Sequence, residues 1–159
     1  MKFDHLLQIN DPLNPLIDPM TPTQLWRGLV LRAQSPKLFV PWLDACEIAV
    51  RSPTVLERVS HYGEVKIHDV VTFVDEFQVR YEVPPQGEIP ASQLVVTIEE
   101  PSVGLLNVRF SYEDGVEDIA GSMEAFYNDH RRSAYRESDI DTIRIIRQMA
   151  GEGRFDRIH

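Results

Sequence analysis

Three polar residues near the middle of the chain have the types and spacing for ligand chemistry: Arg58, Asp69 and Tyr81. The dipeptide Gly63-Glu64 fits a two-residue hairpin turn with glycine first, which sets Arg58 opposite Asp69 on neighbouring strands. A three-residue loop at 74–76 in the next hairpin then sets Asp69 opposite Tyr81. The sequence therefore predicts a polar cluster, and one interpretation is that a desolvated arginine–aspartate pair orients a polar group of a ligand.

Two other interpretations of this cluster remain open from the sequence. The interpretation that the sequence favours is an ordinary cross-strand ion pair near the sheet rim, which would contribute roughly 0.2 to 1 kcal/mol. A register shifted by one residue would instead set Glu57 beside Asp69. Two carboxylates at one site coexist only by sharing a proton or a cation.

The neighbours of the cluster on the same predicted sheet face are apolar, which indicates the concave side of a sheet. They are Leu56, Val71, Phe73, Phe77, Val79 and Val83. Beyond the cluster, the cavity candidates are His5, Trp26, Phe73, Val79, Tyr112, Met123, Phe126, Tyr127 and His130. Each of these is also an ordinary core residue. His130, at helical spacing from Phe126, is either a partly buried histidine bonded to a neighbour or a donor in the pocket.

Other site chemistry finds no support in the sequence. The five histidines, at 5, 61, 68, 130 and 159, show no metal-ligand spacing, so no metal is assigned. Cys46 has no positional link to a histidine and an acidic partner, which leaves a thiol nucleophile unsupported. No nucleophile elbow, phosphate loop or dinucleotide fingerprint is present, so no cofactor is expected. Catalytic residues remain unknown.

Composition limits the partners. The 159 residues carry 25 acidic and 16 basic side chains, a net charge of -9, which disfavours nucleic acid. No apolar stretch is long enough to insert into a membrane. A single cysteine permits no internal disulfide and favours a cytoplasmic location. A homodimer is compatible with the sequence.

The helices and strands that would position these residues are predicted from the spacing of apolar residues and from the turn-forming residues between them. Residues 2–10 alternate as a strand, and residues 11–20 form a proline-rich connector. Thr21, Pro22 and Gln24 predict a sharp helix start with a capping box, and Ser35-Pro36 ends the helix. Six further strands are predicted at 46–51, 54–62, 65–73, 77–83, 93–100 and 105–113.

A second long helix is predicted after Asp114-Gly115, running from the acidic residues 117 and 118 to about Glu137. Its expected inward stripe is Ile119, Met123, Phe126, Tyr127, His130 and Ala134. Ser138 suggests a restart, giving a kink or a short last helix to Met149. One domain over residues 1–150 and a frayed tail over 151–159 are expected.

The chain resembles the SRPBCC superfamily, the START and Bet v 1-like helix-grip proteins, and within it the AtaL-like group. The resemblance covers nearly the whole sequence and is carried by the stretches FDHLLQINDPLNP, LWRGLVLRA, LFVPWLDAC, YGEVKIHDVVTF, IEEP and VRFSYED. It implies an α+β helix-grip fold, with a curved antiparallel sheet of about seven strands wrapped around a long C-terminal helix. An apolar cavity under that helix is also implied.

No fixed chemistry follows from the resemblance, because relatives include lipid carriers, hormone receptors and polyketide cyclases. The leading hypothesis is a protein that binds a small hydrophobic or aromatic ligand in a cavity of several hundred cubic ångströms. One alternative is a cofactor-free cyclase or aromatase with Asp69 or His130 as general acid or base. The other is a protein-interaction module whose cavity is closed.

Overall fold

The computed structural model describes residues 1–115, 121 and 123–156. The chain begins with strand β1, Lys2–Asn10, followed by helix α1, Pro22–Gln34, and the short 3-10 helix η1, Pro36–Leu38. The remaining strands are β2 (Ala45–Ser52), β3 (Val55–Tyr62), β4 (Val65–Val74), β5 (Gln78–Val83), β6 (Ser92–Ser102) and β7 (Leu105–Asp114). Helix α2, Met123–Gly151, is the last element.

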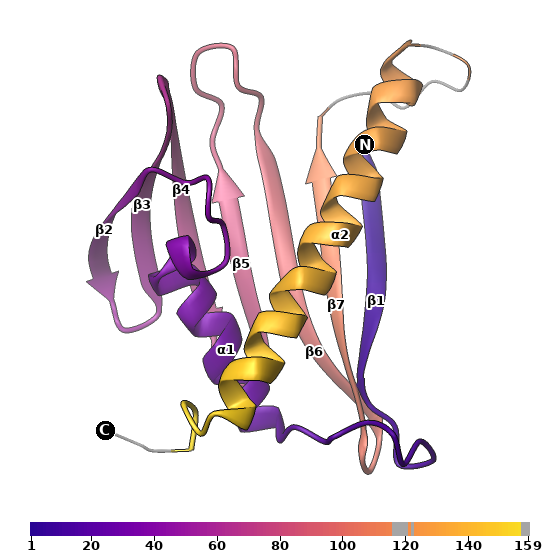
Figure 1. The fold of residues 1–159 in the computed structure, drawn as a ribbon. Helices are drawn as coiled ribbons and strands as arrows, with labels where there is room; N and C mark the ends of the chain where they lie inside the picture. The colour runs from indigo at the N-terminus through magenta and orange to yellow at the C-terminus, as the bar shows by residue number, and fades with distance from the viewer. Residues whose placement is uncertain (116–120, 122, 157–159) are drawn as a thin grey trace.

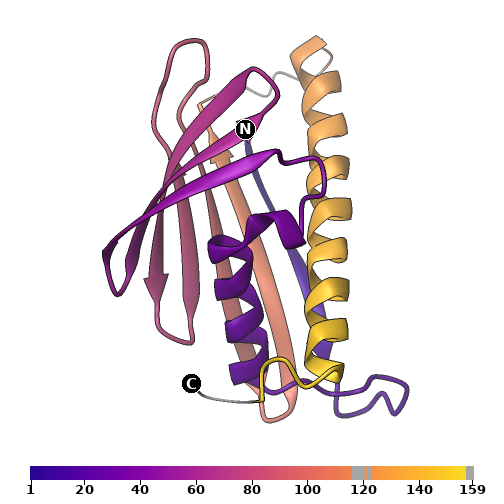
Figure 2. The same cartoon turned by 60° about the vertical axis from the view of Figure 1, so that its left-hand side comes forward.

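The seven strands form one antiparallel sheet in the order β1-β7-β6-β5-β4-β3-β2. The sheet curves, and α1 and α2 both lie on its concave side (Figures 1 and 2). Turns of two or three residues join β2 to β3, β3 to β4, β4 to β5 and β6 to β7, whereas residues 84–91 join β5 to β6. The first strand, β1, pairs with the distant β7 and forms one edge of the sheet. This is the α+β helix-grip architecture expected from the sequence.

Helix α1 begins where the sequence predicts. The Thr21 side chain accepts a hydrogen bond from the backbone of Gln24 at 3.0 Å, and the Gln24 side chain accepts one from the Thr21 backbone at 2.9 Å. Pro22 occupies the first helical position, where its missing N–H costs nothing. The capping box fixes the start of α1, so its apolar face is set against the sheet.

Helix α2 differs from the prediction in two ways. It is continuous from 123 to 151 rather than broken near Ser138, since that segment contains no proline or internal glycine before 151. Its inward face is also different: Met123, Phe126, Tyr127, His130 and Ala134 are exposed, while Ile119 lies outside the described residues. Among the side chains of α2 that the structure describes, the buried ones are Asn128, Asp139, Thr142, Ile143, Ile146 and Met149.

A close crossing of the two helices joins them over the sheet. Gly28 of α1 lies against Ile146 of α2, and a Cβ built on Gly28 would stand 2.4 Å from Ile146 Cγ2. Ile146 is fully buried among Leu25, Leu29 and Phe110 in the core cluster. The absence of a side chain at Gly28 is therefore what allows α1 and the C-terminal half of α2 to pack together.

The hairpin registers settle the alternatives for the polar cluster. Strand β3 pairs with β4 so that Arg58 lies opposite Asp69, as predicted, and Glu57 lies opposite Val70. The β4–β5 register is two residues away from the prediction: Val71, not Asp69, lies opposite Tyr81. The turn comprises residues 75–77, with the backbone of Glu76 at φ 52°. An even shift keeps every side chain on its predicted face, but it moves Phe77 into the exposed turn.

Residues 152–156, which the sequence predicts as part of a frayed tail, are packed against the rest of the structure. Phe155 is buried in the core cluster, and Arg27 of α1 donates a hydrogen bond to its carbonyl oxygen. The Gln24 side chain donates to Asp156 at 2.9 Å. Residues 152–156 thus dock back onto α1. Among the described residues, neither helix combines the length and apolar character needed to cross a bilayer.

Candidate functional site

A buried ion pair joins β3 and β4 on the concave face. Arg58 Nε donates to Asp69 Oδ1 at 2.8 Å and Nη2 donates to Oδ2 at 2.6 Å, a two-point contact between side chains that are 8% and 9% exposed. Arg58 Nη1 donates to the carbonyl oxygen of Ala33, near the end of α1, at 2.9 Å. The pair is interior rather than a rim pair, and it ties the sheet to α1.

Tyr81 of β5 completes the predicted cluster, although through a different neighbour. Its ring lies beside two guanidinium groups, with the Cζ of Arg58 at 5.1 Å and that of Arg32 at 5.8 Å from the ring centroid. These are cation–π distances. Burial raises the pKa of the Tyr81 hydroxyl, so the side chain remains neutral near pH 7.

A cavity of about 190 Å³ opens at this cluster. The sheet contributes Arg58, Ser60, Tyr62, Tyr81 and Leu94 to its wall, and Arg32, Pro36 and Val40 close it from the α1–η1 side. No described lining residue comes from α2. The cavity expected under the last helix is therefore under the end of α1 instead, because the C-terminal half of α2 packs directly on the core. It is also smaller than the several hundred cubic ångströms expected.

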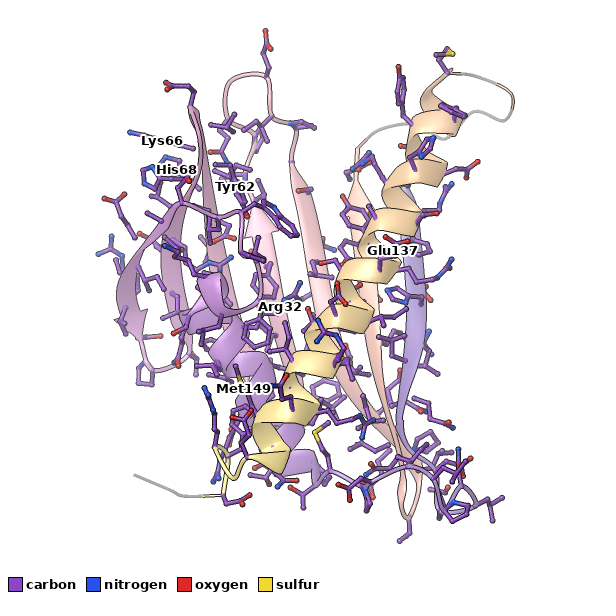
Figure 3. The ribbon with its side chains drawn as sticks, viewed as in Figure 1. Arg32, Tyr62, Lys66, His68, Glu137 and Met149 are labelled. Atoms are coloured by element: carbon purple, nitrogen blue, oxygen red, sulfur yellow. The ribbon has the colours of Figure 1, made fainter. Side chains whose placement is uncertain are left out.

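Arg32 is the site residue that the sequence analysis missed. It lies seven residues after Leu25 and three after Leu29, so its spacing along α1 places it beside the buried stripe. In Figure 3 it lies between α1 and α2, with Tyr62 above it. Burial opposes its charge, but Tyr81 and Asp139 outweigh that effect and raise the pKa of the guanidinium, which stays charged.

A second buried polar group, also unforeseen, connects β1 and β7 to α2. The fully buried Asp139 faces His5 Nε2 at 2.7 Å and accepts from the Tyr112 hydroxyl at 2.9 and 2.8 Å on its two oxygens. Arg32 Nη2 lies 3.8 Å from Asp139 Oδ1. Burial raises the pKa of Asp139, and the opposing effects of Arg32, His5 and Tyr112 reduce that rise. The ring of Tyr112 stacks on the ring of Tyr135, with the two ring centroids 4.0 Å apart.

The other predicted cavity candidates lie elsewhere. Trp26 meets Phe73 edge to face at 6.3 Å in the core cluster, and Val79 is fully buried there. The four candidates on the first turns of α2 are exposed, which contradicts their expected place in the cavity wall. Met123 is 65% exposed, Phe126 56% and Tyr127 58%. His130 is also exposed, and its ring meets that of Phe126 edge to face with the centroids 4.6 Å apart.

Larger hollows are also present. One of about 650 Å³ lies over α1 beside Trp26, the β4–β5 turn and Phe155. Another of about 310 Å³ is lined by Glu47, Glu57 and His68, whose side chains belong to the opposite sheet face from Arg58. Arg58 and Asp69 of the polar cluster also contribute to its lining. Lys66 and His68 lie at that far side of the sheet in Figure 3. Within the described ranges, no three His, Cys, Asp or Glu side chains gather as a metal site.

Sequence comparison gives the family. The model of a family described as "AtaL: Acetylaranotin biosynthesis cluster protein L" matches residues 7–153. The chain belongs to the AtaL family. This match includes β1 from Leu7 onward, both helices and the whole of the cavity wall. No curated protein matches this member of the AtaL family.

Solved structures share the fold of this AtaL-family chain at low identity. The di-domain ARO/CYC StfQ from the steffimycin biosynthetic pathway is 9% identical, with a TM-score of 0.69 over 95% of this chain and 51% of that one. The di-domain ARO/CYC BexL from the BE-7585A biosynthetic pathway is 12% identical, with a TM-score of 0.65 over 93% of this chain and 49% of that one. Ara h 8.0201 is 13% identical, with a TM-score of 0.59 over 92% of this chain and 97% of that one. This chain spans about half the length of the two di-domain proteins. At such low sequence identity, the similarity shows a shared fold and nothing about activity.

Proposed function

We propose that this AtaL-family protein binds a small aromatic or otherwise hydrophobic ligand in the cavity between the concave sheet face and the end of α1. The observation that carries the proposal is the cavity wall. It combines the rings of Tyr62 and Tyr81 and the apolar Leu94 with guanidinium groups, on a fold that encloses space. Apolar walls with a few placed polar groups are typical of small-molecule sites.

Binding is favoured over acid–base catalysis by the positions of the titratable groups. A general acid or base must reach the reacting atoms within hydrogen-bond distance. Asp69 is held at both oxygens by Arg58, and His130 is on the exposed face of α2. Asp139 has no exposed area and is not part of the cavity lining. The groups in the wall are two arginines and two tyrosines, and burial raises the pKa of both tyrosine hydroxyls.

The proposal is tested by blocking the cavity. Leu94 lines the cavity, whereas its neighbour Val95 has its side chain on the opposite face of β6. Calorimetric titration with benzamide, a neutral single-ring probe, is expected to detect binding to the wild-type protein and to Val95→Trp. Leu94→Trp is expected to abolish it. Equal binding to both tryptophan variants would place the probe elsewhere and contradict the proposal.

A homodimer stays a prediction of the sequence. One solved structure with this fold, Aha1 from Colwellia psychrerythraea, is described as a dimer, with 12% identity and a TM-score of 0.55 over 88% of this chain and 91% of that one. Sedimentation velocity at micromolar concentration tests it directly. A monomer over the whole concentration range would contradict a homodimer, without affecting the proposed ligand site.

A further inference from the structure

Arg32 is a cation at the cavity wall with unused hydrogen-bond donors. Its Nη1 is sealed from solvent and has no hydrogen-bond partner among the residues that the structure describes. Its nearest acidic oxygen, Asp139 Oδ1, is 3.8 Å from Nη2, beyond hydrogen-bond distance. A buried N–H group left without a hydrogen bond is energetically costly, so a matching acceptor near this guanidinium would stabilise it.

The other arginine of the wall is held by a hydrogen bond at each of its three nitrogens. Arg58 donates through Nε and Nη2 to Asp69 and through Nη1 to the Ala33 carbonyl oxygen. All three of its nitrogens are therefore engaged, and Arg58 is a fixed part of the wall. Of the two cations that line the cavity, Arg32 is the one that has a nitrogen without a hydrogen-bond partner among the described residues, and its side chain remains 15% exposed.

The charges around the cavity favour an anion. Its described lining contains two guanidinium groups and no carboxylate. The carboxylates that compensate these cations, Asp69 and Asp139, are behind the wall, and each already accepts hydrogen bonds on both oxygens. Although the whole chain carries a net charge of -9, the interior surface that a ligand would meet is positive.

We propose that the ligand is an aromatic carboxylate whose carboxyl oxygens are received by the Arg32 guanidinium and whose ring lies against Tyr62 and Tyr81. This inference rests on the proposed function and names the ligand class for the same cavity. Arginine is suited to a carboxylate because its planar donors match the two oxygens. A volume of about 190 Å³ is below the roughly 300 to 1,000 Å³ of sites for drug-sized ligands, which favours a single ring.

The experiment compares benzoate with benzamide, which has the same shape and no charge, by calorimetric titration at pH 7. Wild-type protein is expected to bind benzoate about tenfold more tightly than benzamide, the increment of one charge-assisted hydrogen bond. Arg32→Gln is expected to lower the affinity for benzoate about tenfold and so to remove this preference. Arg80→Gln is the matched control, because Arg80 is the exposed neighbour of Tyr81 on the opposite face of β5, and it should keep the preference.

Arg32→Gln removes charge compensation from Asp139, so a second measurement covers the event that it does not fold. In the wild-type protein, the NMR signal of the Arg32 Nε–Hε group, assigned through Arg32→Lys, is expected to shift with benzoate and not with benzamide or acetate. A shift with acetate of the same size would mean an anion site without ring recognition and would overturn the ligand class.

The outcomes separate the two proposals. Equal affinity for benzoate and benzamide in the wild-type cavity would overturn the carboxylate inference and leave the proposed function standing. A preference for benzoate that survives in folded Arg32→Gln would overturn the role of Arg32. Failure of both probes to bind would overturn the proposed function itself.

Discussion

The buried pair Arg58–Asp69 makes the sharpest prediction for stability. Replacing Arg58 with leucine leaves the Asp69 carboxylate buried without its cation, which costs about 3 to 5 kcal/mol. Replacing Asp69 with leucine leaves an unpaired guanidinium at a similar cost. In the double variant no charge is orphaned. The main remaining loss is then the hydrogen bond to the Ala33 carbonyl, about 1 to 3 kcal/mol if that oxygen stays unsatisfied.

Urea unfolding of the wild type, both single variants and the double variant measures this coupling. The double variant is expected to be more stable than either single variant, with a coupling free energy of several kcal/mol. The control cycle uses Arg51→Ala and Glu57→Ala. That pair has a similar distance of 2.7 Å, but its side chains are 60% and 49% exposed, so its coupling should stay below about 1 kcal/mol. Losses at Arg58 and Asp69 that add within about 0.5 kcal/mol would refute the reasoning.

Three further predictions concern the elements that hold the cavity. Gly28→Ala should destabilise the protein despite the higher helix propensity of alanine, because overpacking against Ile146 costs about 1 to 3 kcal/mol. In urea unfolding, the double variant Gly28→Ala with Ile146→Ala should lose less free energy of unfolding than the sum of the two single variants. Tyr112→Phe should lower the free energy of unfolding by about 1.5 to 3 kcal/mol where Asp139 is ionised, because a hydrogen bond to its carboxylate is lost. This loss should shrink as pH falls through the raised pKa of Asp139, and a loss that is constant with pH would contradict the role of Tyr112. Thr21→Ala should lower the free energy of unfolding by about 1 kcal/mol through loss of the α1 cap, and no change would show that the capping box is not formed in solution.

The pH dependence of Asp139 has a definite sign. Because burial raises its folded pKa above the unfolded value, ionised Asp139 lowers the stability of the fold, and this loss disappears as pH falls through the folded pKa. The hydrogen bond from Tyr112 lowers the same pKa. Its removal therefore raises the pKa of Asp139 further, which moves the protonation step to higher pH in Tyr112→Phe.

Much of the sheet could be predicted because strand register follows from local turn chemistry. Gly63 supplies the positive φ that the β3–β4 turn uses, at 58°, and one turn then fixes Arg58 opposite Asp69. The β4–β5 turn carries no such residue: Glu76 adopts the left-handed conformation without being a glycine. The sequence therefore predicts a register two residues away from the observed one, although it predicts the strand faces correctly.

The face of α2 could not be predicted because the aromatic stripe and the buried stripe of this helix differ. Phe126, Tyr127 and His130 have the spacing of a core face but lie outward, while Asp139 lies inward. A charged residue is assigned to the surface unless its partners are known, and those partners, His5 and Tyr112, come from strands far away in the sequence. Arg32 was missed for the same reason.

The most direct test of the central claim is an NMR measurement of contacts between a bound ring and the cavity wall. With benzoate added to the wild-type protein, we expect intermolecular nuclear Overhauser effects from the ring protons to the side chains of Tyr62, Tyr81 and Leu94, which line the cavity beside Arg32. Contacts instead with Trp26 and Phe155 would place the ligand in the hollow over α1 and contradict the assignment of the cavity.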